Sequence, residues 1–170
     1  MSGQGKPIGG HVGFSIAEIG LARGVVGICP LPGRDGAGAA DMEVVAAWRP
    51  DLVLTLVQSV ELRRKAMADL PALVFGTGAA WLHFAIPDFG TPNREARAEW
   101  PGLLADLCGR LSIGERILVH CMGGCGRSGM IVLRLMVHMG EQPDAALIRL
   151  RAERPCAVET KAQLAWAIQA

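Results

Sequence analysis

The stretch at residues 116–139 constrains the fold more than any other part of the chain. An apolar run, RILVH, precedes the glycine-rich string CMGGCG, and RSGMIVLRLM follows with apolar residues at helical spacing. A strand, a short loop and a helix in direct succession are typical of α/β domains. We therefore expect the loop at residues 121–128 to lie at the edge of a sheet where such domains bind their ligands.

Elsewhere the chain alternates between strand and helix patterns. Three near-continuous apolar runs are typical of strands covered on both faces: residues 24–29, 51–57 and 81–86. Helical patterns occupy residues 40–48, 59–69, 101–111, 127–139, 143–152 and 160–169. Pro101 should either begin its helix or kink a longer one that starts near Pro92. The alternation predicts a single-domain α/β fold with a mainly parallel central sheet flanked by helices.

The composition is that of a globular chain, with 51% hydrophobic and 19% charged residues. We expect a flexible, glycine-rich leader at residues 1–13 and one domain at residues 14–170. The net charge of +1 provides no general attraction to nucleic acid or membranes, so any anion site has to be local. Five cysteines without the spacing of a disulfide scaffold, and no signal-peptide pattern, favour a reducing, cytoplasmic location.

The glycines of the central loop predict a site for an oxyanion. They permit backbone angles that turn successive N–H groups inward. The helix that follows directs its positive N-terminal end at the same place, and Arg127 adds a fork of donors suited to phosphate. The residues expected to hold phosphate are Met122, Gly123, Gly124, Cys125, Gly126 and Arg127.

Cys121 stands at the strand end beside this loop, where the same field would stabilise a thiolate. A thiolate beneath a bound phosphoryl group is placed for in-line attack on phosphorus. Ser128 would donate a hydrogen bond to the sulfur, and His120 would support the loop from behind. The alternatives are a buried core cysteine and a zinc site, for which the spacing of His120, Cys121 and Cys125 is poor. We expect neither a metal nor a cofactor.

A phosphoryl-transfer site of this kind also needs a general acid for the leaving oxygen. Asp88, in the segment IPDFGTP, follows the predicted strand at residues 81–86 and should lie at the same sheet edge as the cysteine. The simpler alternative for this segment is an ordinary turn. Asp35 and Asp41 are rival acids, because they belong to a glycine-rich loop that follows the first predicted strand. That loop is expected to form the pocket rim, with Arg34 as a contact to substrate.

The segment from Cys121 to Ser128 resembles the C-x5-R-[S/T] signature of the cysteine-dependent protein tyrosine phosphatases. Three other segments make the chain look most like the compact dual-specificity branch, particularly kinase-associated-phosphatase-like proteins: residues 23–34, 86–92 and 151–163. The resemblance runs from about residue 20 to the C-terminus. It implies a phosphatase P-loop between a strand and a helix, and it implies that Asp88 is the general acid.

Two residues keep two interpretations each. Gln163 corresponds to a glutamine that positions the attacking water in related phosphatases, yet Thr160-x-x-Gln163 is also a helix capping box, which we favour. Cys125 is either a small wall residue of the loop or a partner that captures an oxidised Cys121.

The resemblance implies a phosphatase that acts on phosphorylated protein or peptide through a phosphocysteine. Phosphotyrosine is the expected substrate, with phosphoserine and phosphothreonine in addition, because the chain lacks the KNRY-type segment of tyrosine-specific enzymes. The uncharged loop positions 122–126 disfavour inositides, and no basic stripe with aromatics points to nucleic acid. The alternatives are a phosphate-binding pseudophosphatase without turnover, a phosphatase of a non-protein phosphomonoester, and thiol-dependent redox chemistry drawing on Cys125.

Overall fold

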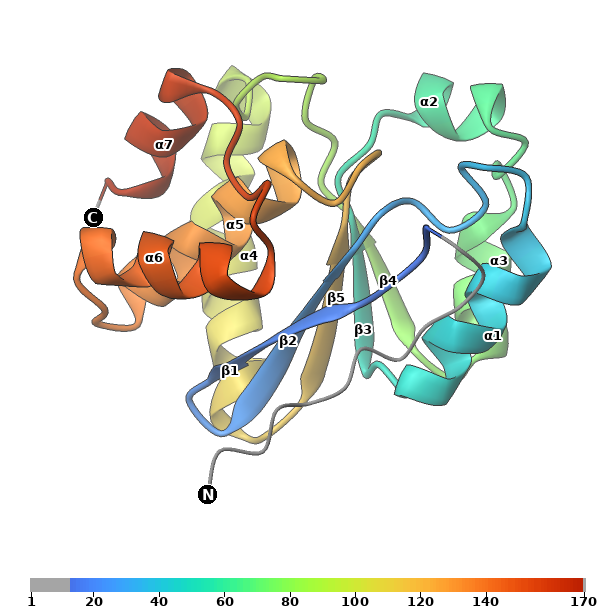
Figure 1. Ribbon diagram of the computed structural model, residues 1–170, viewed down its shortest axis with the longest axis horizontal. Coiled ribbons are helices and arrows are strands. Elements are labelled where there is room, and N and C mark those ends of the chain that lie inside the picture. Colours follow the sequence, from blue (N-terminus) through green and yellow to red (C-terminus); the bar gives the residue numbers. More distant parts are fainter. Residues whose placement is uncertain (1–12, 170) are drawn as a thin grey trace.

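The computed structural model describes residues 13–169, and these contain one five-stranded sheet in the order β1-β2-β5-β3-β4 (Figure 1). The strands are β1 (Ala17–Leu21), β2 (Gly24–Cys29), β3 (Leu52–Thr55), β4 (Ala80–His83) and β5 (Arg116–His120). The edge strand β1 is antiparallel to β2, and the other three pairings are parallel. The predicted mainly parallel sheet is confirmed. The expected leader falls almost entirely on residues 1–12, which lie outside the described part.

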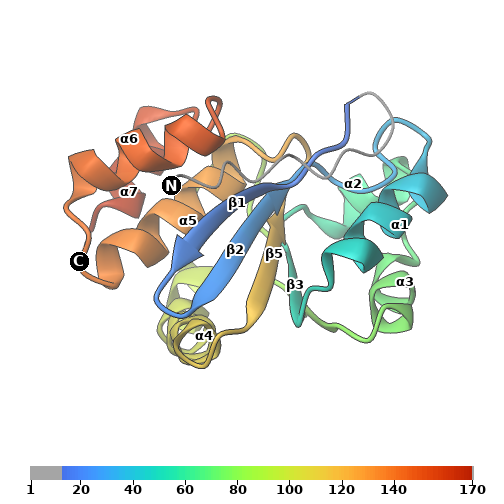
Figure 2. The same ribbon diagram turned by 60° about the horizontal axis from the view of Figure 1, so that its bottom comes forward.

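Helices cover both faces of this sheet. They are α1 (Gly38–Trp48), α2 (Ser59–Arg64), α3 (Leu70–Gly76), α4 (Arg94–Ser112), α5 (Gly126–His138), α6 (Pro143–Glu153) and α7 (Lys161–Ala167). Figure 2 shows α1 and α3 on one side of the sheet and α4 and α5 on the other, with α6 and α7 packed beside α5. Among residues 13–169, none of these helices has both the length and the apolar character needed to cross a bilayer.

Close packing against the sheet depends on small residues at particular strand positions. A Cβ at Gly27, in the middle of β2, would lie 2.7 Å from the ring of Trp48. The indole fills that space, and it is almost completely buried. Its Nε1 donates a hydrogen bond to Glu18 on β1 (2.5 Å), and the Arg116 guanidinium lies 4.1 Å from the ring centre. These contacts fix α1 against three strands.

The sequence prediction was wrong about the segment after β3. A single helix at residues 59–69 was expected, but α2 ends at Arg64 and α3 follows as a separate helix. The break lies at Ala66, whose φ of 55° is in the left-handed region. Alanine is a good helix former, so the sequence gives no sign of this break. The edge strand β1 was not predicted either.

Pro101 lies inside a longer helix, which is one of the two predicted outcomes. Helix α4 begins after Asn93, whose side chain accepts a hydrogen bond from the Ala96 N–H at 2.9 Å. The residue before the proline, Trp100, is buried against Phe84 and Trp166. This aromatic contact anchors the middle of the helix where the proline removes a backbone donor.

The strand register brings three strand ends together. His120, the last residue of β5, pairs with Cys29 of β2 on one side and with Thr55 of β3 on the other. Cys121 therefore leaves the sheet from its middle strand. The loops that follow β2, β3 and β4 flank it, at the carboxyl edge where parallel sheets bind ligands.

Candidate active site

The loop that follows β5 is held from outside by its carbonyl groups. Four consecutive carbonyls accept hydrogen bonds from other segments: Met122 from Leu31 N–H (3.1 Å), Gly123 and Gly124 from the Arg154 guanidinium (2.8 and 2.9 Å), and Cys125 from Val158 N–H (3.3 Å). Within residues 13–169, none of the amide N–H groups of residues 122–128 donates a hydrogen bond. With the carbonyls turned outward, these amides form a concave donor set suited to an oxyanion.

Two glycines of the loop lie in close contact with neighbouring segments. Gly124 has a φ of 66°, and a Cβ there would lie 2.5 Å from the Cys29 carbonyl. A Cβ at Gly126 would lie 2.2 Å from the Glu159 carboxylate and 2.9 Å from the Gln163 amide. A larger residue at Gly124 would meet backbone and displace the loop, whereas a larger residue at Gly126 would require the Glu159 and Gln163 side chains to move.

Arg127 is held by a carboxylate that the sequence did not suggest. Its Nη1 and Nη2 donate to the two carboxylate oxygens of Glu61 at 2.8 and 2.9 Å, and Nη1 also donates to the Ile86 carbonyl at 3.0 Å. Burial acts to raise the pKa of Glu61, but the hydrogen bonds from Arg127 and from Gln58 N–H outweigh it and lower that pKa. Burial likewise acts to lower the pKa of Arg127, but Glu61 and the neighbouring negative charges raise it overall. The guanidinium is thus fixed as a cation.

Asp88 lies within reach of the same guanidinium. Its Oδ1 is 3.0 Å from Arg127 Nη2, and its side chain is 55% exposed. A pocket of about 190 Å³ brings together most of the predicted site residues: Arg34, Asp88, Phe89, Cys121, Met122, Gly123, Cys125, Gly126, Arg127 and Glu159. Asp88 and Cys121 therefore line the same pocket, and the role of Asp88 as general acid stays a prediction.

The rival acids lie elsewhere. Asp41 is buried in the first turn of α1, where its Oδ2 accepts a hydrogen bond from Gly33 N–H at 2.8 Å. Asp35 pairs with Arg34 at 3.1 Å and does not line the pocket. Arg34 does line it, as the sequence analysis expected.

His120 supports the loop through a buried chain of hydrogen bonds. Trp81 Nε1 donates to Thr55 Oγ1 at 2.9 Å, and this hydroxyl lies 2.7 Å from His120 Nε2. The Nδ1 atom, 3.4 Å from the Cys121 carbonyl, must carry the proton, so Nε2 accepts from Thr55. Burial lowers the pKa of His120 to about 4, which keeps the ring neutral. The predicted supporting position of His120 agrees with this geometry.

The buried ring predicts a loss of stability in acid. The pKa of His120 lies below its ordinary value of 6.5, so the unfolded chain binds the proton more tightly than the folded one. The contribution is complete above about pH 6.5 and is lost as the pH falls toward 4, by about 3 kcal/mol in total. Denaturant unfolding of wild type and His120→Asn from pH 7 to 4 measures it. The free energy of unfolding should fall more steeply for wild type, and parallel curves would contradict the assignment.

Ser128 and Gln163 both lie beside the loop, with different outcomes. The Ser128 hydroxyl is buried and has no hydrogen-bond partner among residues 13–169, so the expected bond to the Cys121 sulfur is not formed in this structure. The capping box is formed: Gln163 N–H donates to Thr160 Oγ1 at 3.1 Å, and Thr160 N–H donates to Gln163 Oε1 at 3.2 Å. Gln163 Nε2 also donates to the Gly90 carbonyl at 3.3 Å, which links α7 to the loop that carries Asp88.

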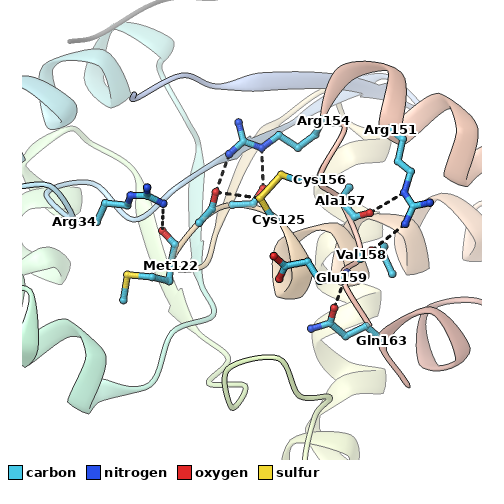
Figure 3. The surroundings of a disulfide bond; sticks show 12 residues. Arg34, Met122, Cys125, Arg151, Arg154, Cys156, Ala157, Val158, Glu159 and Gln163 are labelled. Atoms are coloured by element: carbon cyan, nitrogen blue, oxygen red, sulfur yellow. Dashed lines mark hydrogen bonds between the residues drawn. A yellow bond between two sulfur atoms is a disulfide. The ribbon is translucent and has the colours of Figure 1, made fainter. Parts of the chain in front are cut away.

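One of the two interpretations of Cys125 is wrong. Cys125 lines the pocket, as expected of a wall residue, but its sulfur forms a disulfide with Cys156 and is therefore no partner for Cys121 (Figure 3). The two cysteines are 31 residues apart, and no local pattern connects them. The alternative of a zinc site at His120, Cys121 and Cys125 is not supported either. The Cys125 sulfur is in the disulfide, and both ring nitrogens of His120 are within hydrogen-bonding distance of protein oxygens. No cluster of three or more His, Cys, Asp or Glu residues suited to a metal occurs within residues 13–169.

Known proteins that resemble this chain in sequence or fold are phosphatases. A family model described as "Polymorphic toxin system, DSP-PTPase phosphatase" matches residues 32–141, more than half of the chain. The crystal structure of Tk-PTP in its active form is 31% identical, covers 88% of this chain and 92% of its own, and superposes with a TM-score of 0.68. Kinase associated phosphatase, in a form whose catalytic-site cysteine is replaced by serine, superposes with a TM-score of 0.80 over 92% of this chain and 93% of its own. At 23% identity, the second likeness is one of fold.

The chain also resembles curated sequences of the kinase-associated-phosphatase branch. Cyclin-dependent kinase inhibitor 3 of Rattus norvegicus is 27% identical over 137 residues, which is 76% of this chain and 63% of that protein. The chain spans less than two thirds of the length of the curated relatives that it matches. The match to the family model includes the loop at residues 121–128 and the segment that carries Asp88.

Proposed function

The chain belongs to the DSP-PTPase phosphatase family of polymorphic toxin systems, and from this premise we propose that it is a cysteine-dependent phosphatase of phosphorylated protein. One observation carries the proposal. Cys121, the inward amides of residues 122–128, Arg127 and Asp88 meet in one small pocket. A nucleophile, an oxyanion cradle and a proton donor are thereby within reach of one phosphoryl group.

The reaction proceeds in two displacements. The Cys121 thiolate attacks phosphorus, the bond from phosphorus to the substrate oxygen breaks, and Asp88 gives that oxygen its proton. Arg127 and the loop amides hold the three equatorial oxygens as their charge rises. Water then attacks the phosphocysteine, Asp88 takes up a proton, and inorganic phosphate leaves with the thiolate restored.

The ion pair between Arg127 and Asp88 has to open during this cycle. In this structure an Asp88 carboxyl oxygen lies 3.0 Å from the guanidinium, whereas a general acid has to reach the leaving oxygen of the substrate. A bound phosphoryl group competes for the same Nη2 atom and frees Asp88. Glu61 keeps the guanidinium in place meanwhile, since it binds both terminal nitrogens.

The test is hydrolysis of aryl phosphates in the presence of a chelator, with Asp88→Asn as the diagnostic variant. Wild type should release phosphate from good and poor leaving groups alike. Asp88→Asn should be slower by roughly 10²-fold or more on alkyl phosphates or phenols of high pKa, and much closer to wild type on p-nitrophenyl phosphate. The asparagine has nearly the same size but no proton to give. An equal loss on all leaving groups would remove Asp88 from the role of acid.

Phosphotyrosine in a protein or peptide is the proposed substrate class, with phosphoserine and phosphothreonine in addition. The pocket is small and lined by uncharged loop residues apart from its few ionic groups, which suits a single phosphate on an extended chain. A comparison of phosphopeptides with inositol phosphates and nucleoside monophosphates separates this class from non-protein phosphomonoesters. Phosphopeptide binding without phosphate release would instead identify a pseudophosphatase. The cytoplasmic location stays a prediction.

A further inference from the structure

A disulfide joins the phosphate loop to the loop between α6 and α7 (Figure 3). The Cα atoms of Cys125 and Cys156 are 5.1 Å apart across 31 residues of sequence. Neither sulfur takes part in the phosphatase steps. Cys125 is half-buried, whereas Cys156 is exposed, so solutes reach the bond from its Cys156 end.

Hydrogen bonds connect the same two segments. The Arg154 guanidinium donates to the carbonyls of Gly123 and Gly124, and Val158 N–H donates to the carbonyl of Cys125. These bonds keep the carbonyls outward and hence the amides toward the pocket. The disulfide adds a covalent tie to the contacts that shape the oxyanion cradle.

The anchoring segment is itself fixed to helix α6. Arg151 donates from Nε to the Ala157 carbonyl at 3.0 Å and from Nη2 to the Val158 carbonyl at 2.9 Å. These carbonyls directly follow Cys156, and Figure 3 shows Arg151 hydrogen-bonded to them, while Arg154 is hydrogen-bonded to the phosphate loop. Cys156 is therefore a fixed point, and the disulfide limits how far Cys125 moves from it.

The other cysteines are poorly placed to exchange with this bond. Cys29 and Cys121 are buried, and Cys108 is half-buried on α4, away from the pocket. Burial raises the pKa of the Cys29 thiol, which keeps it protonated and unreactive. A thiol from solution therefore meets Cys156 first.

We infer that the Cys125–Cys156 bond is a thiol–disulfide exchange site, at which a low-molecular-weight thiol lowers the affinity of the loop for phosphate. The thiolate attacks the Cys156 sulfur, forming a mixed disulfide and releasing the Cys125 thiolate. A second thiol attacks the mixed disulfide, releases the Cys156 thiolate and leaves as the oxidised small-molecule disulfide. Two electrons pass to the cysteine pair, and an oxidised small-molecule disulfide reverses both steps.

Reduction makes the phosphate loop more mobile without unfolding it. The hydrogen bonds from Arg154 and Val158 remain, so the loop keeps its fold while Cys125 gains freedom. Phosphate then has to order a more mobile loop and binds more weakly. By linkage, bound phosphate favours the disulfide to the same degree as the disulfide favours phosphate. The inference rests on the proposed phosphate site.

The test measures binding of inorganic phosphate by calorimetry in a Cys121→Ser background, where oxidation of the nucleophile cannot contribute. Peptide mapping first confirms the Cys125–Cys156 link in the oxidised sample. Reduction with dithiothreitol should raise the Kd about fivefold, at the lower end of ordinary coupling between sites. The further substitution Cys156→Ser in the Cys121→Ser background should give the higher Kd, with or without reductant. Adding Cys108→Ser, the matched control, should leave the redox response intact.

A second measurement uses glutathione buffers of graded redox ratio. Saturating phosphate should shift the midpoint for reduction by the same factor of about five toward the reducing side. Equal phosphate affinity before and after reduction would overturn the inference, as would a redox response that persists in the Cys156→Ser variant. If wild type hydrolyses aryl phosphate while affinity is unaffected by reduction, the exchange site alone fails. If the protein binds no phosphate in either the oxidised or the reduced state, and wild type hydrolyses no aryl phosphate, both the exchange site and the proposed function fail.

Discussion

Replacement of Cys121 by serine should abolish hydrolysis while leaving phosphate bound. A serine hydroxyl is a weak nucleophile unless a base removes its proton. The pocket is lined by no histidine within the described residues, and both ring nitrogens of His120 are engaged behind the loop. Loss of a nucleophile costs other hydrolases up to about 10⁶-fold in kcat, and we expect at least about 10⁴-fold here.

Binding should survive because its donors are elsewhere. The amides of residues 122–128 and the Arg127 guanidinium do not depend on the sulfur. Calorimetry with inorganic phosphate should give a Kd within a few-fold of wild type, and trapping of phosphopeptides should improve. Cys108→Ser, which removes a thiol remote from the pocket, serves as the control and should keep full activity. Turnover by Cys121→Ser within tenfold of wild type would refute the phosphocysteine mechanism.

The second large effect is expected at Glu61, a positioning residue that touches no substrate atom in the proposed mechanism. Glu61→Gln keeps the size of the side chain but removes the charge that balances Arg127. Breaking a buried ion pair from one side typically costs at least about 3 kcal/mol of stability. The Arg127 guanidinium would also lose the bidentate contact that fixes its position beside the loop. We therefore expect kcat/KM to fall by roughly 10²-fold.

The pH dependence separates this role from a general loss of packing. The pKa of Glu61 is lower in the folded protein than in the unfolded chain, so its contribution is present above the ordinary carboxyl pKa of about 4.5. The stability difference between wild type and Glu61→Gln should therefore shrink as the pH falls below that value. Glu99→Gln, an exposed change of the same charge on α4, is the control and should be neutral. A difference that does not depend on pH would contradict the ion-pair role.

Much of the fold and part of the site followed from local sequence. Residues 116–120 were predicted as a strand and residues 127–139 as a helix, and the structure has β5 at Arg116–His120 and α5 at Gly126–His138. The glycines between them predict a donor-rich turn because only a small residue fits there, as Gly124 demonstrates. Asp88 was predicted to lie at the same edge of the sheet as Cys121, because the carboxyl ends of parallel strands meet at one edge.

The misses share one physical cause. Glu61, Arg154 and Cys156 lie 66, 30 and 31 residues from their partners in or beside the loop. Each looked ordinary in sequence: a carboxylate in a helix start, a basic residue before a turn, and one cysteine of five. Their roles arise from the meeting of loops after folding, which no pattern over a few residues encodes.

The sequence by itself identified the residues proposed to carry the chemistry: a cysteine and an arginine six residues apart across a glycine-rich turn, with an acid on the loop that follows another strand. Those choices are local, because a strand, a turn and a helix dipole act over a few residues. Tertiary structure alone decided how that chemistry is held. The carboxylate that fixes Arg127, the guanidinium that turns the loop carbonyls outward and the disulfide that ties Cys125 to Cys156 are long-range contacts. They exist only once the sheet has brought its loops to one edge.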